Sequence, residues 1–249
     1  MVSPPNKRLE QTSHERAFGL VESSSSSATF DGLRLTEGKS MFNVCPACGE
    51  YRADKIIVPE GAYAVCPNCG FQHRFIRLPL FILTGASGVG KTTAGLALAA
   101  KLNEFVVMES DILWRDEFNQ PATDYRNYRE TWLRVCKNIS QAGKPVVLCG
   151  AGVPAQFEQC IERRYFSNLH YLALVCEDET LTSRLRNRPA WRGSFKNEYI
   201  EEHIKFNRWL IDNAQDTEPP MTVLNTSEIT MDKSVASVER WLHSRLNEK

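Results

Sequence analysis

The sequence predicts an α/β protein in which a mainly parallel sheet is flanked by helices. After Pro79, apolar runs of strand length alternate with amphipathic segments of helical period. A glycine-rich segment joins the first of these runs to a helical segment, as in proteins that bind phosphates at a strand-to-helix turn. Hydrophobic residues make up 42% of the 249 residues, which allows one sizeable domain and a small appendage.

Periodicity places the expected elements along the chain. Five apolar runs have strand length, at 80–84, 105–108, 145–149, 169–175 and 221–224. Apolar residues recur at helical spacing in 92–102, 132–142 and 235–246. Gly143 and Pro145 supply the stop signal between the second of these helices and the third strand.

We expect three parts in the chain. Residues 1–40 are polar and include a serine run at 23–27, so they predict a mostly disordered tail. Residues 41–78 form a compact segment that is too short to bury a core of its own. Residues 79–249 hold the alternating strands and helices and predict the main domain.

The second part contains two nearly identical turns, Cys45-Pro-Ala-Cys48-Gly and Cys66-Pro-Asn-Cys69-Gly, with 17 residues between them. This spacing is typical of a four-cysteine structural Zn²⁺ site, and a bound metal replaces the missing core. The segment resembles a zinc ribbon, with expected strands at 56–58, 63–65 and within 71–78. Two disulfides or a redox site are the alternatives.

The other four cysteines share no short spacing and lie in apolar elements. They are Cys136, Cys149, Cys160 and Cys176. Core packing is the expected role of these thiols, rather than catalysis.

The segment from Gly85 to Thr92 fits the phosphate-binding pattern G-x-x-x-x-G-K-[ST] at every fixed position. The glycines let backbone N–H groups face the phosphates, Lys91 reaches their oxygens, and the Thr92 hydroxyl ligates Mg²⁺. We therefore expect ATP with Mg²⁺ as the ligand, since the strand and helix flanks argue against an ordinary glycine-rich turn. The expected nucleotide-binding residues are Gly85, Ala86, Ser87, Gly88, Val89, Gly90, Lys91, Thr92 and Thr93.

Acidic residues indicate which kind of nucleotide enzyme this is. The third strand and its end, 145–152, carry no carboxylate, unlike the corresponding strand of motor and helicase ATPases. Glu109 and Asp111 instead follow the second strand, where a doubly wound sheet brings them beside the phosphate loop. This placement suits a phosphotransferase, with Asp111 as candidate base, although spacing does not separate its role from that of Glu109. The alternative is that Asp111 caps a helix that begins at Ile112.

Arginines are dense in 181–193 and predict a lid over the phosphates. Arg188 and Arg192 are better candidates than Arg186 for phosphate contacts within it. A solvated helix face and a patch that binds nucleic acid are the alternatives.

From about Pro79 onward the chain resembles the small-molecule kinase branch of P-loop proteins, which includes shikimate, gluconate, adenylylsulfate and nucleoside or nucleotide kinases. The phosphate loop, the acidic end of the second strand, Gly150 and Gly152 after the third, and the arginine lid carry the resemblance. It implies that these two glycines and the acidic residues line the site of a small phosphate acceptor. It also implies that residues 225–227 lie near the adenine, and that Arg126 or Arg129 holds an anionic or hydroxylated acceptor unless this segment is an exposed helical surface. Asn207 is expected to be a satisfied buried amide.

The leading hypothesis is thus a kinase that moves the γ-phosphate of ATP to a hydroxyl of a small metabolite, such as a nucleoside. The rival is a nucleic-acid-associated NTPase or regulator that grips the polymer with its ribbon. The formal net charge is zero, which gives no global attraction to nucleic acid or membrane. The lack of a long apolar run and of a signal peptide predicts a cytoplasmic protein without a membrane partner.

Overall fold

The structure is a computed structural model that describes residues 43–248, so the predicted tail at 1–40 lies outside the described residues. Two sheets form within this range. One has three antiparallel strands in the order β1-β2-β3, and the other has five parallel strands in the order β5-β6-β4-β7-β8. No helix among the described residues is both long and apolar enough to span a bilayer.

The parallel sheet confirms the predicted fold class. Its strands are β4 (Leu80–Gly85), β5 (Val106–Glu109), β6 (Val146–Cys149), β7 (Leu169–Val175) and β8 (Thr222–Asn225). Each agrees with a predicted apolar run to within one residue at either end. Such continuous apolar runs are expected where helices cover both faces of a parallel sheet.

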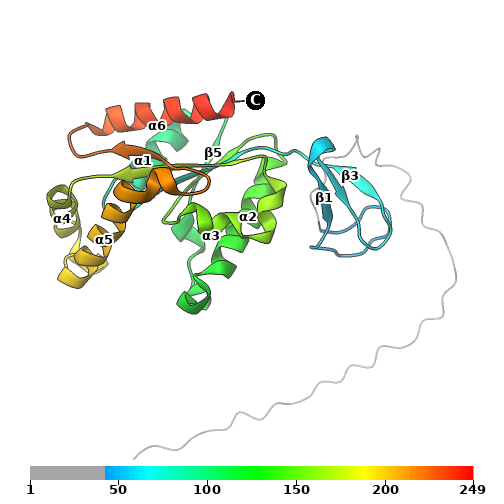
Figure 1. The fold of residues 1–249 in the computed structure, drawn as a ribbon, viewed down its shortest axis with the longest axis horizontal. Helices are drawn as coiled ribbons and strands as arrows, with labels where there is room; N and C mark the ends of the chain where they lie inside the picture. The colour runs from blue at the N-terminus through cyan, green and yellow to red at the C-terminus, as the bar shows by residue number, and fades with distance from the viewer. Residues whose placement is uncertain (1–42, 249) are drawn as a thin grey trace, which may run out of the picture. The chain divides into compact units, whose positions relative to one another are not determined.

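Helices cover both faces of this sheet (Figure 1). They are α1 (Lys91–Lys101), α2 (Arg126–Ser140), α3 (Pro154–Glu158), α4 (Asp178–Arg186), α5 (Asn197–Asn213) and α6 (Met231–Leu246). Short 3-10 helices are η1 (Pro59–Gly61), η2 (Ser110–Leu113), η3 (Asp116–Phe118), η4 (Pro121–Thr123), η5 (Ile161–Tyr165), η6 (Ala190–Arg192) and η7 (Ala214–Asp216).

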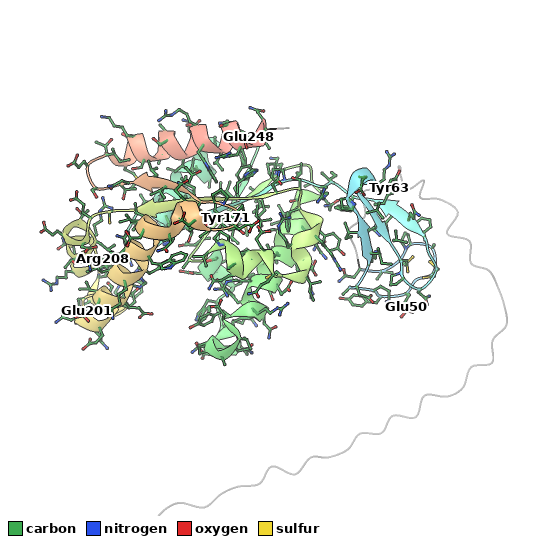
Figure 2. The ribbon with its side chains drawn as sticks, viewed as in Figure 1. Glu50, Tyr63, Tyr171, Glu201, Arg208 and Glu248 are labelled. Carbon is green, nitrogen blue, oxygen red and sulfur yellow. The ribbon has the colours of Figure 1, made fainter. Side chains whose placement is uncertain are left out.

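Alternate side chains of the central strand β4 enter two separate cores. Phe81 and Leu83 pack in the core that includes apolar residues of α1 and α6. Leu80 and Ile82 point to the opposite face and pack with residues of α2 and α3. Tyr171 of the neighbouring strand β7, which is labelled in Figure 2, lies in this second core. The two-residue period of a strand therefore builds both layers.

The three-stranded sheet follows the predicted ribbon. Its strands are β1 (Ile56–Val58), β2 (Tyr63–Val65) and β3 (Gln72–Arg74). The third is shorter than the predicted 71–78. After Arg74 the backbone of Ile76 bonds to the side chain of Gln141, from N to Oε1 at 2.8 Å and from Nε2 to O at 3.0 Å, instead of to another strand.

The ribbon completes its small core with a residue of the main domain. Ala64 and Phe75 are buried with Tyr165 of η5, and the Phe75 and Tyr165 rings meet edge to face with centroids 5.7 Å apart. Arg164 also donates to the carbonyl of Ala53 at 3.0 Å. These contacts explain how so short a segment buries apolar surface.

The alternative role of Asp111 as a helix cap is wrong. Asp111 lies inside η2, and the next α-helix begins only at Arg126. The intervening chain contains Pro121, and Asp124 and Tyr125 adopt positive φ angles of 49° and 55°. Both features interrupt a continuous helix.

A buried ion pair joins α2 to η5. Lys137 Nζ donates to Glu162 Oε2 at 2.6 Å, and the two side chains are 1% and 2% exposed. Burial lowers the pKa of Lys137, while Glu162 acts to raise it. A lysine this deep needs its partner, because an unpaired buried charge is costly.

We expect Lys137→Met to lower the free energy of unfolding by about 3–5 kcal/mol, since it leaves the Glu162 carboxylate with only the half-exposed Arg134. Denaturant unfolding measures the loss. The control is a substitution on α5, Arg208→Ala (Arg208 is labelled in Figure 2). It removes a surface pair with Asp178 of α4 and should cost less than about 1 kcal/mol. Equal losses in the two variants would contradict the assignment.

Candidate active site

The phosphate loop joins β4 to α1 and depends on its glycines. Gly85, Gly88 and Gly90 have φ angles of 145°, 95° and 105°, a region that side chains disfavour. A Cβ on Gly85 would also lie 2.4 Å from the carbonyl oxygen of Leu174. The side chains of Ala86 and Val89 are buried beneath the loop, so only their backbone can face a ligand.

At the start of α1, hydrogen bonds hold the side chains of Lys91 and Thr92. Lys91 Nζ donates to the carbonyls of Gly85 at 2.7 Å and Ala86 at 2.9 Å. Desolvation lowers the pKa of Lys91 to about 8, with Asp111 acting in the opposite direction. Thr92 Oγ1 donates to Glu109 Oε1 at 2.7 Å, which brings the end of β5 against the loop.

A cavity of about 850 Å³ opens above the loop, and we call it the phosphate cavity. Most of the predicted site residues line it. They are Gly85, Ser87, Gly88, Gly90, Lys91, Thr92, Thr93, Glu109, Asp111, Gly150, Arg188 and Arg192. Arg184 lines it as well, whereas Arg186 faces a different depression, with Asp178 and Glu179. The basic side chains and loop amides make this a site for a polyanion.

Ser87 of the loop is the meeting point of the lid and α5. Its hydroxyl accepts from Arg188 Nη1 at 3.3 Å and from the Tyr199 hydroxyl at 3.0 Å. Its backbone N–H donates to His203 Nδ1 at 3.4 Å. The rings of Tyr199 and His203 pack edge to face, with centroids 4.2 Å apart. Two turns of α5 therefore face the phosphate loop.

The loop after β8 also touches the phosphate loop. Thr226 Oγ1 donates to the carbonyl of Val89 at 3.2 Å, and Arg184 donates to both Thr226 Oγ1 and O, at 3.0 and 2.8 Å. The predicted adenine position beside residues 225–227 is consistent with these contacts and stays a prediction.

A second cavity, of about 600 Å³, adjoins the first, and we call it the acceptor cavity. The two share Asp111, Gly150, Ala151, His203 and Phe206 in their walls. Gly150 has to be glycine here, because a Cβ would lie 2.1 Å from Ser110 Oγ. The exposed carboxylate of Asp111 is thus available from both sides.

Arg129 and Gly152, two of the residues predicted to bind an acceptor, line this second cavity, and their role stays a prediction. The backbone of Gly152 is fixed by Thr84, whose Oγ1 donates to its carbonyl at 2.6 Å and accepts from its N–H at 3.1 Å. Arg129 is 8% exposed and its guanidinium lies 3.7 Å from a carboxylate oxygen of Asp124. Arg126 lies outside this cavity wall and pairs loosely with Glu130 at 4.0 Å.

Several site residues carry no signal in the sequence. Tyr199 and His203 reach a loop more than a hundred residues earlier, and no short motif marks them. The Arg184 position was within the arginine-rich segment but was not distinguished from its neighbours. The aromatic side chains of the acceptor cavity, such as Trp114 and Tyr128, are also unmarked by any spacing.

The groups that were expected to be structural are buried. Asn207 is fully buried, donates to the carbonyl of Cys176 at 2.7 Å and accepts from its N–H at 3.2 Å. Cys136, Cys149 and Cys160 are also buried, and burial raises the pKa of each thiol to about 12. Thiols with such a pKa are poor nucleophiles.

The four ribbon cysteines converge, with sulfur atoms all within 4.8 Å of one another. Cys45 and Cys69 sulfurs are 3.7 Å apart, and those of Cys48 and Cys66 are 3.9 Å apart. Four thiolates at the usual Zn–S distance of about 2.3 Å would be separated by roughly 3.8 Å, so the donor set fits Zn²⁺. The backbone N–H of Glu50 and then the Asn68 amide lower the pKa of Cys48 to about 6.

Comparisons with known proteins agree with this architecture. A family model described as an AAA domain matches residues 82–204. No curated protein sequence matches the chain. A sugar kinase from Janibacter sp. HTCC2649 is similar in structure, with 16% identity, a TM-score of 0.51, and coverage of 67% of this chain and 95% of that one.

Two further solved structures align over a similar share of the chain. A shikimate kinase from Bacteroides thetaiotaomicron has 21% identity and a TM-score of 0.43, covering 67% of this chain and 98% of that one. A gluconokinase from Sinorhizobium meliloti 1021 has 16% identity and a TM-score of 0.44, covering 68% and 98%. The likeness to the sugar kinase, with the phosphate loop and the strand order, shows a P-loop kinase-like fold from β4 onward.

Proposed function

We propose that this chain is an ATP-dependent kinase that transfers the γ-phosphate to a hydroxyl of a small molecule bound in the acceptor cavity. One observation carries the proposal. The phosphate cavity and the acceptor cavity meet at Asp111, Gly150 and Ala151. A carboxylate at such a junction can accept the proton of an acceptor hydroxyl that faces the terminal phosphate of a nucleotide on the loop.

The chemistry follows from this placement. The acceptor hydroxyl gives its proton to Asp111 while its oxygen forms a bond to the γ-phosphorus. The bond from that phosphorus to the bridging oxygen breaks, and ADP leaves with the electron pair. Lys91, Arg188 and Arg192 stabilise the negative charge on the transferred group and the leaving oxygen. Together with the phosphate loop, the lid would keep competing water from the phosphorus.

Thr92 and Glu109 provide the hard oxygen donors that Mg²⁺ prefers. Thr92 donates its proton to Glu109, so its oxygen lone pairs remain available for an ion. Thr92 and Glu109 would hold the Mg²⁺, and the bound ion would offset the negative charge of the phosphates. We therefore assign the two carboxylates to different roles, Glu109 to the metal and Asp111 to the acceptor, which the sequence had left open.

We expect the affinity for ATP to fall as pH rises through the pKa of Lys91. In the protein without nucleotide, Lys91 has a pKa of about 8, and bound phosphates raise this pKa by favouring the charged form. Above pH 8 binding must therefore take up a proton. The Kd for a non-hydrolysable ATP analogue, measured by calorimetry, should rise about tenfold between pH 7.5 and 9.

The matched control for this pH dependence is Lys91→Arg. A guanidinium remains charged throughout the range, so the Kd of this variant should stay nearly constant between pH 7.5 and 9. A wild-type Kd that does not change with pH would contradict the assignment of Lys91 to the phosphates.

Substitutions of the two carboxylates should have different kinetic effects. We expect Asp111→Asn to lower kcat by about 10²- to 10⁴-fold, because the acceptor proton loses its base, with little change in ATP affinity. We expect Glu109→Gln to raise the Mg²⁺ concentration needed for half-maximal rate. Both are measured by steady-state kinetics on whichever member of a panel of nucleosides, sugars and hydroxy acids is phosphorylated. If Asp111→Asn shifts the Mg²⁺ dependence and Glu109→Gln does not, this assignment of roles is wrong.

We infer that the ribbon holds one structural Zn²⁺ through Cys45, Cys48, Cys66 and Cys69, because their sulfur separations fit a tetrahedral tetrathiolate. The ion would stabilise a segment whose own apolar core is small.

We expect the purified protein to contain about one zinc per chain, and Cys66→Ser to lose it and to unfold at lower temperature. Metal analysis and thermal unfolding give the two readouts. Cys176→Ala changes a buried thiol outside the ribbon and should retain the zinc. Full zinc content in Cys66→Ser would show that the metal lies elsewhere.

A further inference from the structure

The wall of the acceptor cavity is unusually rich in aromatic side chains. Trp114 follows η2, Tyr125, Tyr128 and Trp132 lie at or within α2, Phe157 lies on α3, and Trp209 lies on α5. Trp114 packs edge to face on Tyr128, with centroids 5.2 Å apart, and is tilted against Tyr125 at 5.9 Å. These contacts fix the rings as a wall.

The polar ends of two of these rings are already used. The Tyr128 hydroxyl donates to the carbonyl of Ser110 at 2.5 Å, and Trp132 Nε1 donates to the same oxygen at 3.0 Å. Both residues therefore turn their polar atoms toward η2. The partly exposed ring of Tyr128 leaves surface for a ligand, whereas the ring of Trp132 is buried behind it. A flat ring is the shape that such surfaces contact best, because stacked and edge-to-face pairs add to simple burial.

The charges in the wall argue against an anion. Its only lining cation among residues 43–248 is Arg129, apart from the ring of His203. The Arg129 guanidinium pairs with Asp124 at 3.7 Å, and both carboxylate oxygens of Asp124 accept from Gln156 Nε2 at 2.9 Å. The other charged lining groups, Asp111 and Glu202, are acidic. Burial lowers the pKa of His203, which keeps this ring neutral near pH 7.

An anionic acceptor would have to displace Asp124 from Arg129 and approach two further carboxylates. A neutral ring meets neither cost and gains the aromatic contacts. The cavity volume of about 600 Å³ is in the range that small-molecule sites occupy and admits a ring with a hydroxylated substituent. The hydroxyl then points toward Asp111, where the two cavities meet.

We propose that the acceptor is an uncharged ring-bearing alcohol of about nucleoside size, held by the aromatic wall, and that the Asp124–Arg129 pair excludes carboxylate and phosphate acceptors. This rests on the proposed kinase function. A cavity that binds a hydroxy acid would instead be expected to contain an arginine without a carboxylate partner.

Equilibrium binding tests the substrate class without requiring transfer. Trp114, Trp132 and Trp209 are three of the five tryptophans in the chain, so their fluorescence reports occupancy of the cavity. With a non-hydrolysable ATP analogue present, nucleosides and phenyl-substituted alcohols are titrated against their monophosphate or carboxylate counterparts and against open-chain polyols. We expect uncharged ring alcohols to bind at least about tenfold more tightly than the matched anions. Tighter binding of hydroxy acids, phosphates or polyols, or no binding of any ring alcohol at millimolar concentration, overturns the proposal.

A gain-of-function variant tests the charge argument directly. Asp124→Asn keeps an acceptor for Gln156 but frees the charge of Arg129. We expect it to improve binding of the anionic counterparts by about tenfold and to change binding of the neutral ring alcohols by less than about twofold. The control is Asp116→Asn, the same charge change on exposed η3 outside the cavity wall, which should improve neither. Equal gains in the two variants would show a long-range charge effect and overturn the role of the pair.

The wall itself is tested by Trp114→Leu, which should weaken binding of ring alcohols by about tenfold, with thermal unfolding as the check on folding. Transfer is then assayed separately. Ring alcohols that bind but are never phosphorylated would refute the kinase function and leave the substrate class standing. Phosphorylation of a hydroxy acid or polyol in preference to ring alcohols would do the reverse.

Discussion

The parallel pairing of β4 between β6 and β7 is the constraint on which the rest of the site depends. The register sets Leu83 opposite Cys149 and Gly85 opposite Leu174. Because β5 is parallel as well, the strands end at one edge of the sheet and deliver the phosphate loop, Glu109 and Gly150 to the same place. The tolerances are small, since a side chain on Gly85 would meet β7 and one on Gly150 would meet Ser110. The residues after β5 and β6, Asp111, Gly150 and Ala151, line both cavities.

The two cavities divide the electrostatic task. The phosphate cavity gathers Lys91, Arg184, Arg188 and Arg192, so a highly charged ligand gains most there. In the acceptor cavity the arginine lies near a carboxylate, and the remaining surface is mostly apolar, with several aromatic rings. This difference in charge supports the proposal that a triphosphate binds on one side and a neutral ring alcohol on the other. In the proposed reaction, Asp111 at the junction of the two cavities is the group that accepts the acceptor proton.

Local patterns predicted much of this fold and part of the site. The apolar runs gave all five strands of the parallel sheet, and the glycine-rich motif gave the loop, because both signals are contained in a few adjacent residues. The irregular chain between β5 and α2 could not be predicted, since Asp124 and Tyr125 take positive φ angles that nothing local requires. Contacts of long sequence separation were also hidden, such as those of Tyr199 and His203 with Ser87. Arg129 was predicted to line the acceptor site, but its neutralisation by Asp124 depends on the same irregular turn, and that turn changes which acceptor is expected.

In the proposed kinase, the contacts of Lys91 and Arg188 would couple nucleotide binding to the position of the predicted lid. Burial is the main cause of the lowered pKa of Lys91, and repulsion by the nearby Arg188 lowers this pKa further. Arg188 is tied to Ser87 of the loop, so the lid and the loop already share a contact. A triphosphate on the loop offsets the desolvation of Lys91 and its repulsion by Arg188 at once. Because such coupling is reciprocal, any change that holds Arg188 at the loop strengthens nucleotide binding by the factor with which the nucleotide holds the lid. In the proposed kinase, Arg188 of the predicted lid would thus contribute to nucleotide affinity as well as cover the site.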